Sequence, residues 1–159
     1  MSGKLFTCVG LAGLLGLTAV GATCTWTGAA GDGLWATPGN WQNNAVPTSS
    51  DTVVIPANTA DAMDAGDTVR TLAGLTFTQP VGSFTLKGAG LRVANNVTLK
   101  MFGGKSVTID CPFALTGTDR KLTIGSSTNS VLTFKQPVSA STISATTYTG
   151  TSDGYAHNA

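Results

Sequence analysis

From residue 50 onward, apolar and polar residues alternate in a series of short segments, each bounded by Gly, Asn, Ser or Pro. Alternation with a period of two is typical of a β-strand with one buried face, and no segment beyond the first 24 residues has a helical period. The segments are DTVVI, GLTFT, SFTLK, LRV, NVTLK, SVTID, FAL, KLTIG and VLTFK. The pattern therefore predicts an all-β protein.

The apolar positions of these segments recur in three sets, and within each set the step from one member to the next is 22 to 25 residues. The first set is Val53, Leu75, Val97 and Leu122, each followed two residues later by Ile55, Phe77, Leu99 and Ile124. The second set is Phe84, Val107 and Leu132, followed by Leu86, Ile109 and Phe134, and the third is Val69, Leu91, Phe113 and Val138. Three strand positions that share one repeat length predict a coil with three sides.

A three-sided coil cannot bury its apolar inner face alone, whereas stacked coils about 4.8 Å apart bury that face continuously. We therefore expect a short right-handed parallel β-helix of about four coils, over residues 51–145, with like residues above like. Glycine-bearing corners such as Gly88–Gly90 would separate the strands. The alternative is an antiparallel β-sandwich or barrel, which short strands and turns also fit.

The N-terminal segment MSGKLFTCVGLAGLLGLTAVGATC has a cationic start, an apolar run and an end of small residues. This order predicts a secretory signal peptide over residues 1–22, with Val20 and Ala22 placed for cleavage after Ala22, and a secreted or cell-surface protein. An uncleaved anchor helix is one alternative, although the apolar run is shorter than the roughly 20 residues that span a bilayer. A lipoprotein anchored through Cys24 is another. After signal removal we expect no membrane span.

Charged residues make up 11% of the chain, glutamate is absent and the net charge is +1, so no basic surface predicts nucleic-acid binding. Removal of the signal peptide would leave Cys24 and Cys111 as the two cysteines. An exported chain permits a disulfide between them, and two thiols are the alternative.

Residues 56–67, PANTADAMDAGD, lack an alternating run and predict a loop. Asp61, Asp64 and Asp67 lie three residues apart there, so they are weak candidates for a calcium site, with a solvated turn as the alternative. We predict no cofactor and no catalytic residue, because His157 stands near the chain end and the aspartates form no tuned pair. A polysaccharide-active enzyme would require Asp110, Lys100 or Lys121 to converge in a groove.

All three tryptophans, Trp26, Trp35 and Trp41, lie in the stretch TWTGAAGDGLWATPGNW, within a segment of residues 23–50 that precedes the first coil. Large amphipathic rings in this position suit a cap that closes the first end of the β-helix. The alternative is a carbohydrate-binding module, in which exposed indoles would stack on sugar rings. The two predictions differ in whether the rings face the core or solvent.

The stretch TWTGAAGDGLWATPGNWQNNAVPTSSDTVVIP resembles the leading segment of bacterial exported β-helical proteins with autotransporter-associated repeats. The matching positions are Trp26, Gly28, Trp35, Asn40, Trp41, Val46, Pro47, Asp51, Val53 and Ile55. The stretch SVTIDCPFALTGTDRKLTIGSSTNSVLTFKQPVSA is similar to the repeat itself, so the resemblance covers about residues 25–140. It implies a β-helix used as a stalk or passenger. Residues 146–159 form an unassigned tail, either disordered or a truncated coil.

The sequence thus predicts an exported, non-enzymatic structural or surface-interaction protein: a spacer, an adhesin-like element or a self-assembling β-helix. Its expected partners are a second copy, stacked end to end, or a cell-surface glycan.

Overall fold

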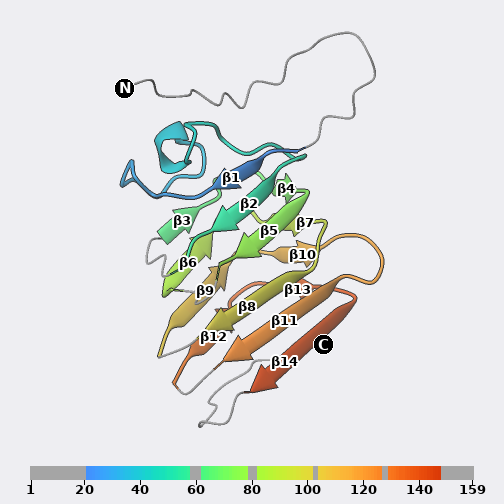
Figure 1. Cartoon of the computed structure of the whole chain (residues 1–159). Helices are drawn as coiled ribbons and strands as arrows, with labels where there is room; N and C mark the ends of the chain where they lie inside the picture. The colour runs from blue at the N-terminus through green and yellow to red at the C-terminus, as the bar shows by residue number, and fades with distance from the viewer. Residues whose placement is uncertain (1–20, 58–61, 79–81, 102–103, 127–128, 148–159) are drawn as a thin grey trace.

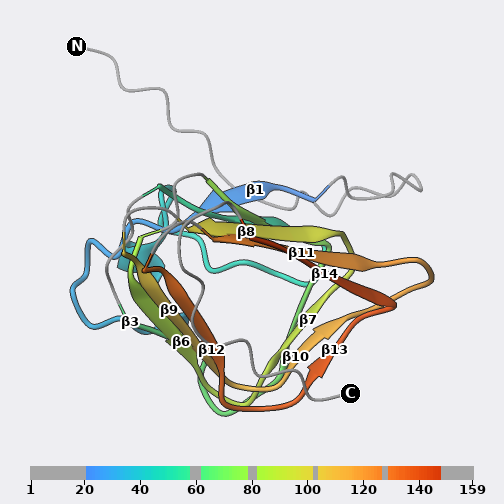
Figure 2. The ribbon, with the colours of Figure 1, turned by 90° about the horizontal axis from the view of Figure 1, so that it is seen from below.

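The computed structural model describes residues 21–57, 62–78, 82–101, 104–126 and 129–147. Within these ranges the chain forms a stack of parallel β-coils, with the N-terminal end at the top and the C-terminal end at the bottom of Figure 1. Seen from below in Figure 2, the chain runs from β8 to β9 to β10 counter-clockwise while it advances toward the viewer. The predicted right-handed parallel β-helix, a β-solenoid of about four turns, is therefore confirmed.

Each coil contributes one strand to each of three faces (Figure 2). The first face contains β1 (Thr23–Thr25), β2 (Thr52–Ile55), β5 (Gly74–Phe77), β8 (Val97–Met101), β11 (Lys121–Ser126) and β14 (Thr142–Thr147). The second face contains β3 (Ala62–Asp64), β6 (Phe84–Lys87), β9 (Ser106–Asp110) and β12 (Val131–Phe134). The third face contains β4 (Arg70–Leu72), β7 (Leu91–Val93), β10 (Phe113–Leu115) and β13 (Val138–Ser139).

The observed register agrees with the repeat in the sequence at most positions. Val53 pairs with Leu75, Val97 with Leu122, and Val107 with both Phe84 and Leu132, all in parallel. The inward residues form one hydrophobic cluster, in which Val53, Val97, Val107 and Leu122 are fully buried. Burial of like residues above like explains why the repeat determines which strands pair.

Two expectations were wrong. Val69 does not begin the third set: Arg70 pairs with Leu91, and Val69 is 48% exposed, because the corner before β4 holds one more residue than the repeat length implies. The predicted loop over residues 56–67 contains β3, in which Met63 pairs with Leu86 and is buried. A strand of three residues with one inward side chain gives no alternation to detect.

The first face is interrupted between β5 and β8, which lie in separate hydrogen-bonded sheets. The side chain of Asn95 lies in this interruption and its Oδ1 accepts a hydrogen bond from the backbone N–H of Leu75, at 3.2 Å. The corner between β6 and β7 needs glycine. Gly88 has a φ of 125° there, and a Cβ at this position would lie 2.9 Å from the carbonyl oxygen of Gly66 in the coil above.

In the part of the chain that the structure describes, no helix has the length and apolar character needed to cross a membrane. The one helical element there is a 3-10 turn, η1 (Pro38–Asn40), in the segment above the first coil.

Candidate functional site

The three tryptophans lie together at the top of the solenoid, buried against the first coil. Trp26, Trp35 and Trp41 are 1%, 1% and 2% exposed and belong to the same hydrophobic cluster as Val53 and Met63. Trp41 is the central ring, with its centroid 5.0 Å from that of Trp26 and 4.8 Å from that of Trp35, both in edge-to-face geometry. We call residues 26–41 the cap. Its indole faces are covered by protein and are not available for stacking on a sugar ring.

Asn40 holds the turns of the cap in place and is fully buried. Its Nδ2 donates hydrogen bonds to Asp32 Oδ1 and to the carbonyl oxygen of Leu34, and its Oδ1 accepts one from the backbone N–H of Ala30 at 3.0 Å. Its backbone carbonyl also accepts from the N–H of Thr27 at 2.8 Å. The side-chain donors and acceptor of this buried amide are thus all satisfied, as burial requires.

Asp32 completes this network from the exposed side of the cap. The hydroxyl of Thr37 donates to its Oδ2 at 2.6 Å, and the backbone N–H of Leu34 donates to its Oδ1 at 2.9 Å. These hydrogen bonds, with that of Thr37 foremost, hold the pKa of the Asp32 carboxyl below its ordinary value. The carboxylate is therefore a hydrogen-bond acceptor for the cap at neutral pH.

The cap, together with β1 that precedes it, continues the upper edges of two faces of the solenoid. On the first face, β1 pairs in parallel with β2, and the N–H of Trp26 donates to the carbonyl of Val54 at 2.9 Å. On the second face, the N–H of Trp35 donates to the carbonyl of Asp64, and the N–H of Asp64 donates to the carbonyl of Gly33, both at 2.8 Å. The upper backbone edges of β2 and β3 are thereby paired, whereas β4 is the outermost described strand of the third face.

The three indole N–H groups differ. Trp41 Nε1 donates to the carbonyl oxygen of Trp35 at 2.8 Å, which ties the centre of the cap together. Trp26 Nε1 and Trp35 Nε1 are buried and have no acceptor among the described residues. A buried donor without an acceptor costs about 1–3 kcal/mol. The shape of the rings therefore matters more than the hydrogen bonding at these two positions.

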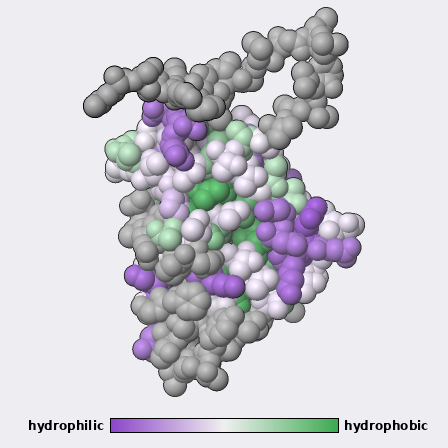
Figure 3. Space-filling view, viewed as in Figure 1, coloured by the Kyte–Doolittle hydropathy of each residue, from purple (hydrophilic) through white to green (hydrophobic). Residues whose placement is uncertain are grey.

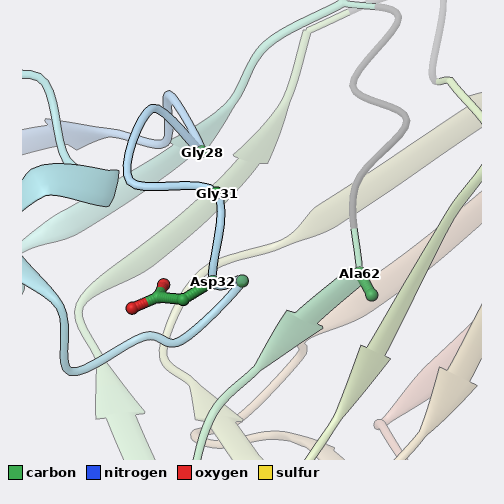
Figure 4. Close-up of a pocket in the computed structure, with 5 residues that line it drawn as sticks. Gly28, Gly31, Asp32 and Ala62 are labelled. Carbon is green, nitrogen blue, oxygen red and sulfur yellow. The ribbon is translucent and has the colours of Figure 1, made fainter.

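A small pocket of about 180 Å³ opens between the glycine-rich turn of the cap and the start of β3. Figure 4 shows that its wall comes from Gly28, Gly31, Asp32 and Ala62, and that the Asp32 side chain points away from Ala62. Because that carboxylate already bonds to the cap, the pocket offers a ligand mainly backbone groups and a methyl group.

Of the three candidate calcium ligands, the structure describes Asp64 and Asp67, and these do not form part of a metal-binding group there. Asp61 lies outside the described residues, Asp67 is exposed at a corner, and Asp64 Oδ2 lies 3.4 Å from Lys87 Nζ. No group of three or more His, Cys, Asp or Glu side chains close enough to hold a metal ion occurs within the described ranges.

The outer side of the second face carries a ladder of alternating charge that the sequence analysis missed. Asp64 pairs in register with Lys87, Lys87 with Asp110, and Asp110 Oδ2 lies 3.1 Å from Lys135 Nζ. Lys100 and Lys121 lie in β8 and β11 of the first face, so the structure does not bring them to Asp110 in a common groove.

Cys24 in β1 and Cys111 after β9 are both buried, and no disulfide joins them. Burial, followed by the negative charge of Asp110, raises the pKa of the Cys111 thiol to about 11. Cys111 is therefore protonated and unreactive at neutral pH.

At the other end of the solenoid, the last coil has no cover among the described residues, and we call this the open end. β12, β13 and β14 are the last strands of their sheets, and no strand of the described chain pairs with their lower edges. Ile143 pairs in register with the buried Leu122, yet it is 42% exposed because no further described coil lies below it. Phe134 and Val138 at the same end are partly buried. Figure 3 shows the adjoining first face as a mixed surface with a hydrophilic cluster at its right edge.

Comparisons of the chain with protein-family models, curated proteins and solved structures found no match.

Proposed function

We propose that this chain is an exported, non-enzymatic structural protein of the cell surface or exterior: a short β-solenoid that acts as a spacer or assembly unit. The observation that carries the proposal is the difference between its two ends. One end is closed by β1 and the cap, whereas at the other end, as far as the described residues reach, the last strands have unpaired edges and the core is partly exposed.

The N-terminal signal-like segment and the resemblance to repeats of exported β-helical proteins support the exported part of this proposal. The side faces support the structural part, because their polar residues are used within the solenoid. Outward Thr85, Thr108 and Thr133 stack in register, and the charges of the second face pair with one another along the stack.

The open end is the surface most suited to assembly. Unpaired strand edges are templates for further pairing, and β1 and the cap already occupy the upper edges of two faces. The open end of one copy is therefore expected to meet the open end of another, which gives a closed two-fold dimer instead of a filament. Carbohydrate binding through the tryptophans is not favoured, since the three indoles are buried.

Sedimentation of the purified chain tests this proposal. We expect a dimer whose population rises with protein concentration, and we expect Ile143→Lys to make the chain monomeric because it places a charge on the exposed end of the core. Val69→Lys is the matched control: Val69 is also apolar and 48% exposed, but it lies beside β4 near the cap. A wild-type chain that stays monomeric, or a loss of dimer that is equal in both variants, would contradict assembly through the open end.

A further inference from the structure

The carboxylate of Asp51 lies below the first residues of the described chain and is only 8% exposed. Its Oδ1 accepts a hydrogen bond from the backbone N–H of Ala22, and its Oδ2 accepts from the N–H and the hydroxyl of Thr48, each at 2.7 Å. All three donors are neutral. The ion pairs between described side chains are Asp64–Lys87 and Asp110–Lys135, so none of them provides Asp51 with a positive charge.

Ala22 is the point at which the chain joins the body of the solenoid. Its carbonyl oxygen accepts a hydrogen bond from the N–H of Thr52 at 2.9 Å, and its side chain packs against the hydrophobic core. Gly21 is exposed, and a Cβ at that position would collide with the carbonyl oxygen of Ser50. The structure thus uses Ala22 and every residue after it in β1, but it leaves no room for a side chain at residue 21.

We propose that the N-terminal segment is removed by hydrolysis of the bond between Gly21 and Ala22, and that the new α-ammonium of Ala22 forms a partly buried ion pair with Asp51. Water adds across the peptide bond: Gly21 keeps the carboxylate, and the nitrogen of Ala22 becomes an amine that takes up a proton. This inference rests on the export in the proposed function.

The sequence on the upstream side fits this position. Ala19 and Gly21 place small residues at the third and first positions before the cut, as signal cleavage requires. The cut lies one residue before the one expected from the sequence pattern alone. Cleavage after Ala22 would remove the hydrogen bonds that Ala22 makes to Asp51 and Thr52.

The chemical effect of the cut is to add a full positive charge at an atom that already lies 2.7 Å from the carboxylate. In the uncut chain, burial acts to raise the pKa of Asp51, but the hydrogen bonds from Thr48 and Ala22 outweigh it and leave the pKa below its ordinary value. An ammonium at the same place strengthens the contact as a charge-assisted hydrogen bond. Removal of the N-terminal segment would therefore stabilise the solenoid.

The pair predicts a specific pH dependence. A carboxylate raises the pKa of a neighbouring ammonium, so the stabilisation is fully present below the ordinary α-amino pKa of about 8 and is lost as the pH rises through the raised value. The strands packed around the pair, β1, β2 and β5, carry one titratable side chain, Cys24. The nearest strand of the third face, β4, carries Arg70, whose Nε donates to the carbonyl of Ala65.

The first measurement is the N-terminal peptide mass of the full-length chain after production in an exporting bacterial host. An exported protein that begins at Ala22 supports the inference. An exported protein that begins at Thr23, or upstream of Ala22, overturns the inference and leaves export standing. A chain retained uncut inside the cell overturns both.

The second measurement is the melting temperature of the processed chain between pH 7 and pH 10. We expect a fall of several degrees for the wild type and no such fall for Asp51→Asn or for a chain that retains Gly21 ahead of Ala22. If Asp51→Asn does not fold, the comparison of the wild type with the Gly21-retaining chain still tests the ion pair. Asp67→Asn, at an exposed corner aspartate, is the matched control and should keep the fall. The same pH dependence in all four proteins would overturn the ion pair.

Discussion

The two ends of the solenoid show what a repeating sequence can specify and what it cannot. Leu122 and Ile143 occupy equivalent inward positions of neighbouring coils, yet Leu122 is fully buried and Ile143 is 42% exposed. Described strands lie both above and below Leu122, whereas no described strand lies below Ile143, and this difference in cover explains the difference in exposure. At the N-terminal end a non-repeating segment with three tryptophans provides this cover.

The chemistry of the two ends also differs. The cap combines edge-to-face indoles with a buried side-chain amide, that of Asn40, whose hydrogen bonds reach Ala30, Asp32 and Leu34 of the loop. The open end has apolar side chains and free strand edges, with no comparable polar network among the described residues. We therefore expect substitutions in the cap to affect the free energy of unfolding, and substitutions at the open end to affect association.

The largest effect is expected for Trp41→Ala. This change removes the central ring of the cap and its hydrogen bond to Trp35, and it should lower the free energy of unfolding by about 3–5 kcal/mol. Ile143→Ala at the open end removes a side chain that is already partly hydrated, so it should cost about 1 kcal/mol or less. Urea denaturation followed by tryptophan fluorescence or circular dichroism measures both.

Two milder variants test how much the hydrogen bond of the Trp41 indole contributes to this loss of stability. Trp41→Phe loses a satisfied hydrogen bond, whereas Trp26→Phe removes an indole N–H that has no acceptor among the described residues, so Trp26→Phe should be the less destabilising. Equal losses for Trp41→Ala and Ile143→Ala would mean that the closed end is no more important for stability than the open end.

Asn40→Ala is expected to have the next largest effect, a loss of about 2–3 kcal/mol, because it removes the acceptor for the N–H of Ala30 and the donor to Asp32 and Leu34. Asn43→Ala is the matched control: the same change at an exposed asparagine three residues away should cost less than about 0.5 kcal/mol. Amide hydrogen exchange in residues 27–41 should rise in the Asn40 variant. If exchange rises evenly over the whole solenoid instead, Asn40 does not act on the cap specifically.

The strands and most of their register could be predicted from the sequence, because a buried inner face forces apolar residues to recur at each coil. Val97 above Leu122 follows directly from this requirement. Corners impose no such requirement, which is why the repeat predicts Val69 as the partner of Leu91, whereas the true partner is the next residue, Arg70. The strand around Met63 was missed for a related reason, since a three-residue strand holds one inward side chain.

The cap could be placed from its tryptophans, but its hydrogen-bond network could not be predicted. The contacts of Asn40 with Ala30 and Asp32 depend on turns whose geometry no periodic pattern encodes. Likewise, nothing in the sequence around Asp51 indicates that its carboxylate meets the backbone of Ala22, 29 residues earlier. The charge ladder could have been found, because Asp64, Lys87 and Asp110 follow the same repeat as the apolar positions.

The charge ladder also connects the two ends, and it gives the smallest of the expected effects. Asp64 lies beneath Leu34 of the cap, and Lys135 lies at the open edge. Lys87→Glu would place a third acid between Asp64 and Asp110, where neighbouring coils hold the backbone on both sides, whereas Glu at position 135 could turn away from Asp110 into solvent. Because these side chains are well exposed, we expect a loss on the order of 0.5 kcal/mol for Lys87→Glu and a smaller one for Lys135→Glu.

Thermal melting at low ionic strength measures the difference between the two variants, and about 0.5 M salt should abolish this difference through screening. Lys100→Glu on the first face is the control for a change of net charge; if it matches Lys87→Glu, the order of charges along the ladder does not contribute to stability.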